Sequence, residues 1–87
     1  MRIDKFLNAV NITKRRAVAE DMLEHKVVYI NGVAVKKAKE VKVGDIIEIR
    51  YLEYTEEYKV LQIPLTKSTP KSKQLDYIEK LKGKDNV

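Results

Sequence analysis

The chain has 87 residues, a mass of 10.1 kDa, 44% hydrophobic residues and a formal net charge of +5, which allows one small domain with a limited core. It has no cysteine and its single histidine is His25, so it lacks the residues for disulfides, thiolate metal sites and histidine-based catalysis, and we expect no catalytic residues, no metal and no cofactor. No apolar run is long enough to cross a bilayer and the first residues do not form a signal peptide, which predicts a cytoplasmic protein that does not enter membranes.

The first predicted helix begins near residue 3. Its apolar positions are separated by three and four residues, which places them on one helix face: Ile3, Phe6, Leu7 and Val10. Asp4 falls in the first turn, where a carboxylate stabilises the free backbone amides, and we interpret it as a structural residue.

A second helix follows closely. Asn11 interrupts the first pattern, and Thr13 is predicted to cap the second helix. Four residues form its predicted apolar face: Val18, Ala19, Met22 and Leu23. A connection of about two to four residues would force the two helices to pack as a helical hairpin.

Strand periodicity begins at residue 28. Residues 28–30 and 33–35 flank Asn31-Gly32, the dipeptide most typical of a two-residue hairpin turn. We therefore predict a tight β-hairpin directly after the second helix.

Further strands are predicted after a basic loop. Gly44-Asp45 marks a turn, and residues 46–52 and 58–63 are predicted strands, the second of which ends at Pro64. Residues 74–81 are predicted to form a short helix through Leu75, Ile78 and Leu81.

These elements predict an α+β fold in which a two-helix hairpin packs on a small, mostly antiparallel β-sheet. We expect one domain over residues 1–65. Residues 66–87 are rich in Lys, Ser, Thr and Pro and are predicted to form a flexible basic tail, partly disordered or a short helix.

The acidic and aromatic residues of the central stretch favour structural roles. Glu53 and Glu56-Glu57 would supply the carboxylates of an acid–base pair, but no pocket-forming elements surround them, so we predict a solvated turn. Three tyrosines near them are expected to pack against the sheet: Tyr51, Tyr54 and Tyr58. Tyr29 is expected to be a half-buried strand residue, with stacking on a nucleobase as the alternative.

The charges are separated along the chain. Residues 1–44 carry ten Lys or Arg against five Asp or Glu, residues 45–66 carry two against five, and residues 67–87 carry six against three. This separation favours a basic face that binds phosphate over a composition that serves solubility alone.

Lys14-Arg15-Arg16 opens the second helix, where each exposed cation opposes the helix dipole at a cost of about 0.3–1 kcal/mol. A phosphate bound there would gain from the side chains and from the free amides. If the hairpin packs beside the helices, this run shares one face with Arg2 at the start of the first helix and with the lysines after the hairpin. Such a face would follow a nucleic-acid backbone.

Several motifs then agree in order with the small RNA-binding domain named after ribosomal protein S four, also called the αL motif. They are MRIDKFL at residues 1–7, KRRxxA at 14–19, VxING at 28–32, VKKAKEV at 35–41 and GD at 44–45. The chain resembles this family over residues 1 to 52, and the resemblance implies two helices packed on a small sheet.

Stand-alone members of that family form two groups, the ribosome-associated quality-control protein P family and a ribosome-binding heat-shock family. The chain is similar to the first group in length and in its Lys-Arg-Arg run. That resemblance implies binding to large-subunit rRNA and to P-site peptidyl-tRNA on an obstructed large ribosomal subunit. There it would support template-free elongation of the nascent chain by a tRNA-recruiting elongation factor on the same subunit.

The resemblance also implies the site residues. Arg2 and Arg16 would be the main phosphate contacts, and Lys14, Arg15, Lys36 and Lys37 would extend the surface. The full predicted RNA-binding set is Arg2, Lys5, Lys14, Arg15, Arg16, Lys36, Lys37 and Lys39. Lys26 departs from the family, which has glycine after the second helix, and a positive φ there would cost about 1 kcal/mol.

Other functions remain open from the sequence. The heat-shock group would use the same face, and a protein-interaction module could present its basic face to an acidic partner. A double-stranded DNA binder has the right charge on its second helix but lacks the short polar side chains that read base edges. We expect the free protein to be a monomer.

Overall fold

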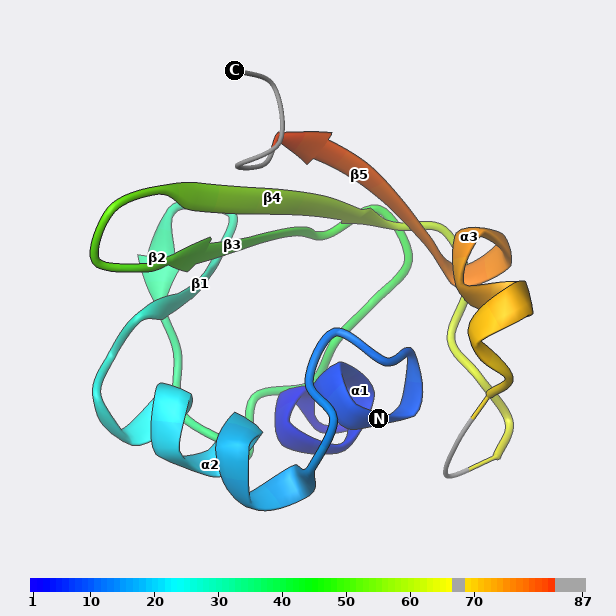
Figure 1. The fold of residues 1–87 in the computed structure, drawn as a ribbon, viewed down its shortest axis with the longest axis horizontal. Coiled ribbons are helices and arrows are strands. Elements are labelled where there is room, and N and C mark those ends of the chain that lie inside the picture. Colours follow the sequence, from blue (N-terminus) through cyan, green and yellow to red (C-terminus); the bar gives the residue numbers. More distant parts are fainter. Residues whose placement is uncertain (67–68, 83–87) are drawn as a thin grey trace.

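Within residues 1–66 and 69–82, which the computed structural model describes, a five-stranded antiparallel sheet forms one layer and two helices lie beneath it (Figure 1). The helical segments are α1 (Ile3–Ala9), α2 (Arg16–Glu24), the 3-10 helix η1 (Lys71–Lys73) and α3 (Gln74–Tyr77). The strands are β1 (Val28–Ile30), β2 (Val33–Ala34), β3 (Ile46–Arg50), β4 (Thr55–Val60) and β5 (Ile78–Lys82), in the spatial order β2-β1-β3-β4-β5. The predicted α+β architecture is confirmed.

The core lies between α1, α2 and the inner face of the sheet. The four apolar residues predicted for the first helix are all fully buried: Ile3, Phe6, Leu7 and Val10. From the sheet, Val28, Ile47 and Ile49 reach the same core because alternate residues of a strand face one side. The helical spacing of the sequence therefore identified the α1 side of the core correctly.

Both long helices end in the same motif, in which the residue after the helix adopts a left-handed conformation. After α1, Asn11 has a φ of 65° and its amide donates to the Asn8 carbonyl. After α2, Lys26 has a φ of 59° and its amide donates to the Leu23 carbonyl. The backbone amide of the next residue donates a second hydrogen bond in each case. Together these bonds satisfy free carbonyls in the last turn of each helix.

The β1–β2 hairpin forms where Asn31-Gly32 predicts it. Asn31 and Gly32 have φ values of 52° and 85°, as a primed two-residue turn requires, and Ile30 pairs with Val33. The Asn31 side chain also accepts a hydrogen bond from the Ile46 amide at 3.0 Å, which connects the turn to the start of β3.

Three predictions about the second helix are wrong. Arg15 is the N-cap of α2, and Thr13 is buried before it, with no hydrogen-bond partner for its hydroxyl among the described residues. Val18 is 46% exposed, because the inward face of α2 is formed by Ala19 and Leu23. The connection covers residues 10–15, longer than predicted, because residues 11–13 first complete the end of α1 through amide bonds to its carbonyls.

The strand predicted over residues 58–63 instead begins at Thr55 and ends at Val60. Glu56 and Glu57 lie in β4 and not in a solvated turn, because β3 pairs with β4 along its whole length, Glu48 opposite Glu57. Glu56 accepts a hydrogen bond from the Tyr58 hydroxyl at 3.0 Å, which compensates for its position beside the core.

The helix predicted over residues 74–81 is correct only for its first turn. Ile78 begins β5, is 1% exposed and pairs with Val60. Leu75 and Leu81 are 72% and 47% exposed, so the three apolar residues do not share a helix face. Pairing with β4 therefore overrides the local helical spacing.

Part of the predicted tail belongs to the fold. The Thr69 hydroxyl donates to the Ala9 carbonyl at 2.8 Å, and the Gln74 amide group donates to the Val10 carbonyl at 2.9 Å. Residues 69–82 thus close the end of α1 and extend the sheet, while residues 67–68 and 83–87 of the predicted tail lie outside the described residues.

Candidate nucleic-acid interface

Arg2 lies at the start of α1 and is held by Asp4. Its Nε donates to Asp4 Oδ1 at 3.1 Å and its Nη2 donates to Oδ2 at 2.6 Å. Asp4 is fully buried, whereas the Arg2 side chain is 39% exposed. The hydrogen bonds that it donates to Asp4 raise the pKa of Arg2 above its ordinary value. Asp4 therefore has the structural role expected of it, since it orients a permanently charged guanidinium at the surface.

The first residues pair with the loop after β2. The Ile3 amide donates to the Lys39 carbonyl at 2.7 Å, and the Val41 amide donates to the Met1 carbonyl at 2.9 Å. The Met1 ammonium group also contacts the Glu40 carboxylate, which lowers the pKa of Glu40. These contacts form a bridge in which Arg2 lies opposite Glu40, and they bring the neighbouring Lys39 near Arg2, although 37 positions separate Lys39 and Arg2 in the sequence.

The start of α2 is open to an anion. Within the part of the chain that the structure describes, its N-cap residue, Arg15, makes no side-chain capping bond, and the first turn contains no acidic residue. Lys14 and Arg15 are exposed. The start of α2 therefore combines free backbone amides, the positive end of the helix dipole and two cations. Arg16 begins the helix, but its side chain lies outside the described part of the structure.

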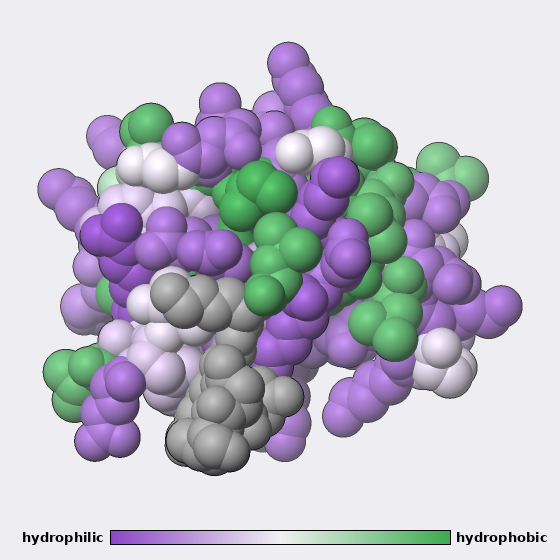
Figure 2. Space-filling model, turned by 90° about the horizontal axis from the view of Figure 1, so that it is seen from above, coloured by the Kyte–Doolittle hydropathy of each residue, from purple (hydrophilic) through white to green (hydrophobic). Residues whose placement is uncertain are grey.

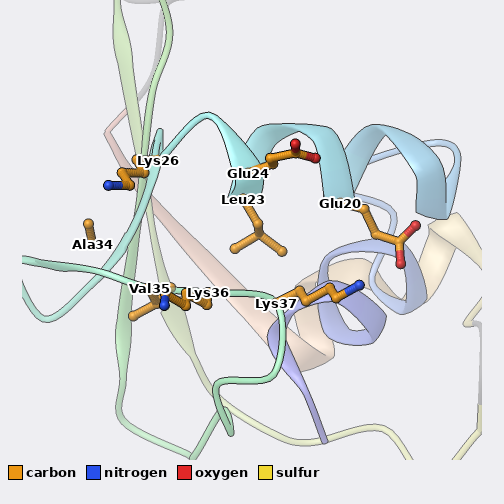
Figure 3. A pocket seen from close by; sticks show the side chains of 8 residues that line it. All are labelled: Glu20, Leu23, Glu24, Lys26, Ala34, Val35, Lys36 and Lys37. Atoms are coloured by element: carbon orange, nitrogen blue, oxygen red, sulfur yellow. The ribbon is translucent and has the colours of Figure 1, made fainter.

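Lys36 and Lys37 are exposed at the edge of a hollow of about 670 Å³ between α2 and the segment after β2 (Figure 3). Eight residues line this hollow: Glu20, Leu23, Glu24, Lys26, Ala34, Val35, Lys36 and Lys37. In Figure 3 the Lys37 side chain extends across the hollow toward Glu20. Glu20 also contributes to the raised pKa of Arg2, although less than Asp4 does.

The structure thus groups most of the predicted site residues around α1, α2 and the loop after β2. Lys39 lies next to Glu40, the bridge partner of Arg2, and Lys36 and Lys37 line the hollow together with α2. Lys5 is exposed on α1, and its backbone amide donates to Asp4 at 2.9 Å. The sequence pattern did not predict the hollow, because the hollow depends on how α2 packs against the segment after β2.

Tyr29 and Arg50 form a contact that the sequence analysis did not foresee. The Arg50 guanidinium lies 3.9 Å from the centre of the Tyr29 ring, and its Nε donates to Glu48 at 2.9 Å. Tyr29 pairs with Glu48, so Arg50, two residues further along β3, projects from the same face. One ring face of Tyr29 is therefore covered, in agreement with a half-buried strand residue.

The acidic stretch of the sequence lies in the sheet layer. Residues 45–57 form β3, the start of β4 and the turn between them, on the far side of the core from α1 and α2 (Figure 1). Tyr51 and Tyr54 stack there with ring centres 4.6 Å apart, and burial, with Glu56 close by, raises the pKa of Tyr51 to about 12. Figure 2, seen from above the sheet, shows mostly hydrophilic residues with apolar side chains among them.

Two further features concern metals and membranes. In the described ranges, no group of three His, Cys, Asp or Glu side chains is placed to hold a metal ion. None of the helices in residues 1–66 and 69–82 combines the length and the apolar character that a membrane span requires.

Comparison with known proteins matches residues 1–47 to the S4 domain. A protein of Helicobacter pylori (strain J99), named RQC P-site tRNA stabilizing factor, is 49% identical over 78 residues, covering 90% of this chain and 93% of that protein. The solution structure of the hypothetical protein HP1423 has a TM-score of 0.82 at 45% identity and covers 97% of this chain and 100% of its own. The trimeric heat shock protein 15 of Vibrio cholerae has a TM-score of 0.83 at 25% identity, covering 93% and 81%.

Proposed function

Because the chain belongs to the S4 domain family, and to the family of the RQC P-site tRNA stabilizing factors, we propose that it is an RNA-binding protein of ribosome quality control that acts at P-site tRNA. In this proposal it binds large-subunit rRNA and peptidyl-tRNA on obstructed large ribosomal subunits. It acts by positioning the tRNA and not by chemistry, and it supports template-free elongation by a factor that recruits charged tRNA.

The observation that supports this proposal most strongly is the pairing of residues 1–3 with residues 39–41. It brings Arg2, held by Asp4, next to the basic loop, within the segment that matches the S4 domain. Phosphate contacts from such a face fix the orientation of a protein on RNA, and the shape of the rRNA–tRNA junction would supply selectivity.

The proposal is tested by co-sedimentation of the protein with large subunits that carry peptidyl-tRNA. Lys14→Gln/Arg15→Gln removes two exposed cations at the open start of α2, so we expect a loss of association of about tenfold or more at physiological salt.

The matched control is Lys59→Gln/Lys73→Gln, which removes the same charge from exposed positions in β4 and η1. It is expected to retain at least half of the wild-type association. Equal losses of subunit association in both variants would show non-specific electrostatic attraction. Wild-type protein that does not sediment with large subunits at low salt would overturn the ribosomal role.

A second candidate is the heat-shock type of factor, which is favoured by the structural similarity to heat shock protein 15. Both functions would use the same basic face, so binding does not separate them. Measuring untemplated elongation in extracts separates the two functions. If the protein acts in quality control, its removal is expected to reduce this elongation. Unchanged elongation together with intact subunit binding would favour the heat-shock type.

A further inference from the structure

The hollow between α2 and the segment after β2 has an apolar floor and charged walls of both signs (Figure 3). Leu23, Ala34 and Val35 form its apolar part. Glu20 and Glu24 line the helix side, and three lysines complete the wall: Lys26, Lys36 and Lys37.

These opposite charges form no direct ion pairs among the described residues. Among the described residues, no ion pair within 4.0 Å includes Glu20, Glu24 or any of the three lysines. In the described residues, carboxylates therefore line one wall and ammonium groups the other without a direct ion pair between them.

We propose that this hollow binds one unpaired nucleotide of the RNA partner, and that Glu20 and Glu24 select a base that carries an exocyclic amino group. The proposal rests on the proposed function, since it takes RNA as the partner. The lysines contact the phosphate, and the apolar floor contacts the face of the base. The carboxylates accept hydrogen bonds from the amino group, as Glu and Asp do from N4 of cytosine.

The composition of the hollow argues against simpler ligands. Glu20 and Glu24 would repel a bare anion, and the lysines would repel a bare cation. A purely apolar ligand would leave five charged groups desolvated without partners. A nucleotide combines phosphate, amino group and a flat apolar surface, and a hollow of about 670 Å³ lies within the usual range for small-molecule sites.

The position of the hollow also fits single-stranded RNA. Lys36 and Lys37 belong to the proposed RNA-binding face and line the hollow at the same time, so a strand that follows this face reaches it. Proteins read RNA sequence mainly at bases that are displaced from a stack and hydrogen-bonded along their edges.

Binding of fluorescently labelled hexamers of cytidine and of uridine to the free protein tests the proposal. The two hexamers have the same phosphate charge and differ at position 4 of the base, where cytidine has an amino group and uridine a carbonyl. We expect the wild type to bind oligo(C) about fivefold or more tightly than oligo(U). In Glu20→Ala/Glu24→Ala both hexamers gain from lower repulsion but oligo(C) also loses its hydrogen bonds, so the ratio of the two affinities is expected to fall to about one.

Asp21→Ala is the matched control, because it removes one carboxylate from the same helix outside the hollow and should leave the ratio unchanged. Ala34→Phe fills the hollow at an exposed strand position and should abolish the preference. A wild type that binds both hexamers equally, as expected if the hollow receives a protein side chain, would overturn the proposal.

The outcome is separable from that of the proposed function. Wild-type protein that co-sediments with large subunits but shows no preference for cytidine refutes the nucleotide site alone. A clear preference for cytidine, lost in Glu20→Ala/Glu24→Ala, together with no association with large subunits, supports the nucleotide site and refutes the ribosomal role.

Discussion

Lys26 follows α2 with a φ of 59°, a conformation that costs an L-residue about 1–2 kcal/mol. The strain persists because the helix end depends on it: the Lys26 amide donates to Leu23 and the Val27 amide donates to Met22. The family resemblance singled out this position, where the family has glycine, and left open whether φ is positive there; the structure shows that it is. Asn11 and Asn31 occupy the same backbone region at less cost, since asparagine tolerates it better.

Lys26→Gly is therefore expected to raise the free energy of unfolding by about 1 kcal/mol, because glycine adopts a positive φ without steric cost. Urea denaturation of the two proteins measures the difference. Lys26→Ala is the control, since it removes the same charge but keeps the Cβ atom, and it should give no comparable gain. Equal stabilisation by both substitutions would assign the effect to charge and contradict backbone strain.

The elements that the sequence predicts well are those set by local pattern. The spacing of Ile3, Phe6 and Leu7 defines α1, and Asn31-Gly32 defines the β1–β2 turn. The errors lie where long-range pairing decides. Glu56 and Glu57 have little strand preference and lie in β4 only because β3 pairs with them. Residues 78–82 have a helix-like spacing and become β5 because β4 offers a free edge.

Ile78 tests whether β5 belongs to the cooperative fold. It is 1% exposed in the core, so Ile78→Ala is expected to lower the free energy of unfolding by about 2–5 kcal/mol. Thermal denaturation should show this as a fall of at least about 8 °C in the midpoint for a chain of this size.

Leu75→Ala, in α3 and 72% exposed, is the control for the same segment and should change stability by less than about 0.5 kcal/mol. An Ile78→Ala variant that unfolds with the wild-type midpoint would mean that the segment is a peripheral addition and not part of the core.

At the scale of the whole molecule, the charge separation of the sequence becomes a separation in space. The basic residues of the first half surround α1, α2 and the loop after β2, and the acidic stretch lies in β3 and β4 (Figure 1). The sequence predicted a set of basic site residues but not how the fold arranges them. The contact between residues 1–3 and 39–41 consists of isolated backbone bonds, which leave no periodic signal, and the hollow depends on the packing of α2 against the loop.

This arrangement predicts a salt dependence for tRNA binding. Each phosphate contact contributes about 0.7–0.9 to the slope of log K against log salt, so Lys36→Gln/Lys37→Gln should reduce the slope by about 1.5. Titrations at several salt concentrations measure the slope, and Lys59→Gln/Lys73→Gln should leave it nearly unchanged. A slope that is unaffected by the first variant would remove these two lysines from the phosphate-binding face.

The hydrogen bonds that close α1 also set the order in which the chain matures during its own synthesis. The acceptors, Ala9 and Val10, leave the ribosome early, whereas the donors, Thr69 and Gln74, follow 60 and 64 residues later. Contacts between such distant positions form only after a large loop has closed, which slows folding. The basic half of the molecule is therefore translated well before it is stabilised, and a nascent chain acquires its final structure only when the last strand is free to pair.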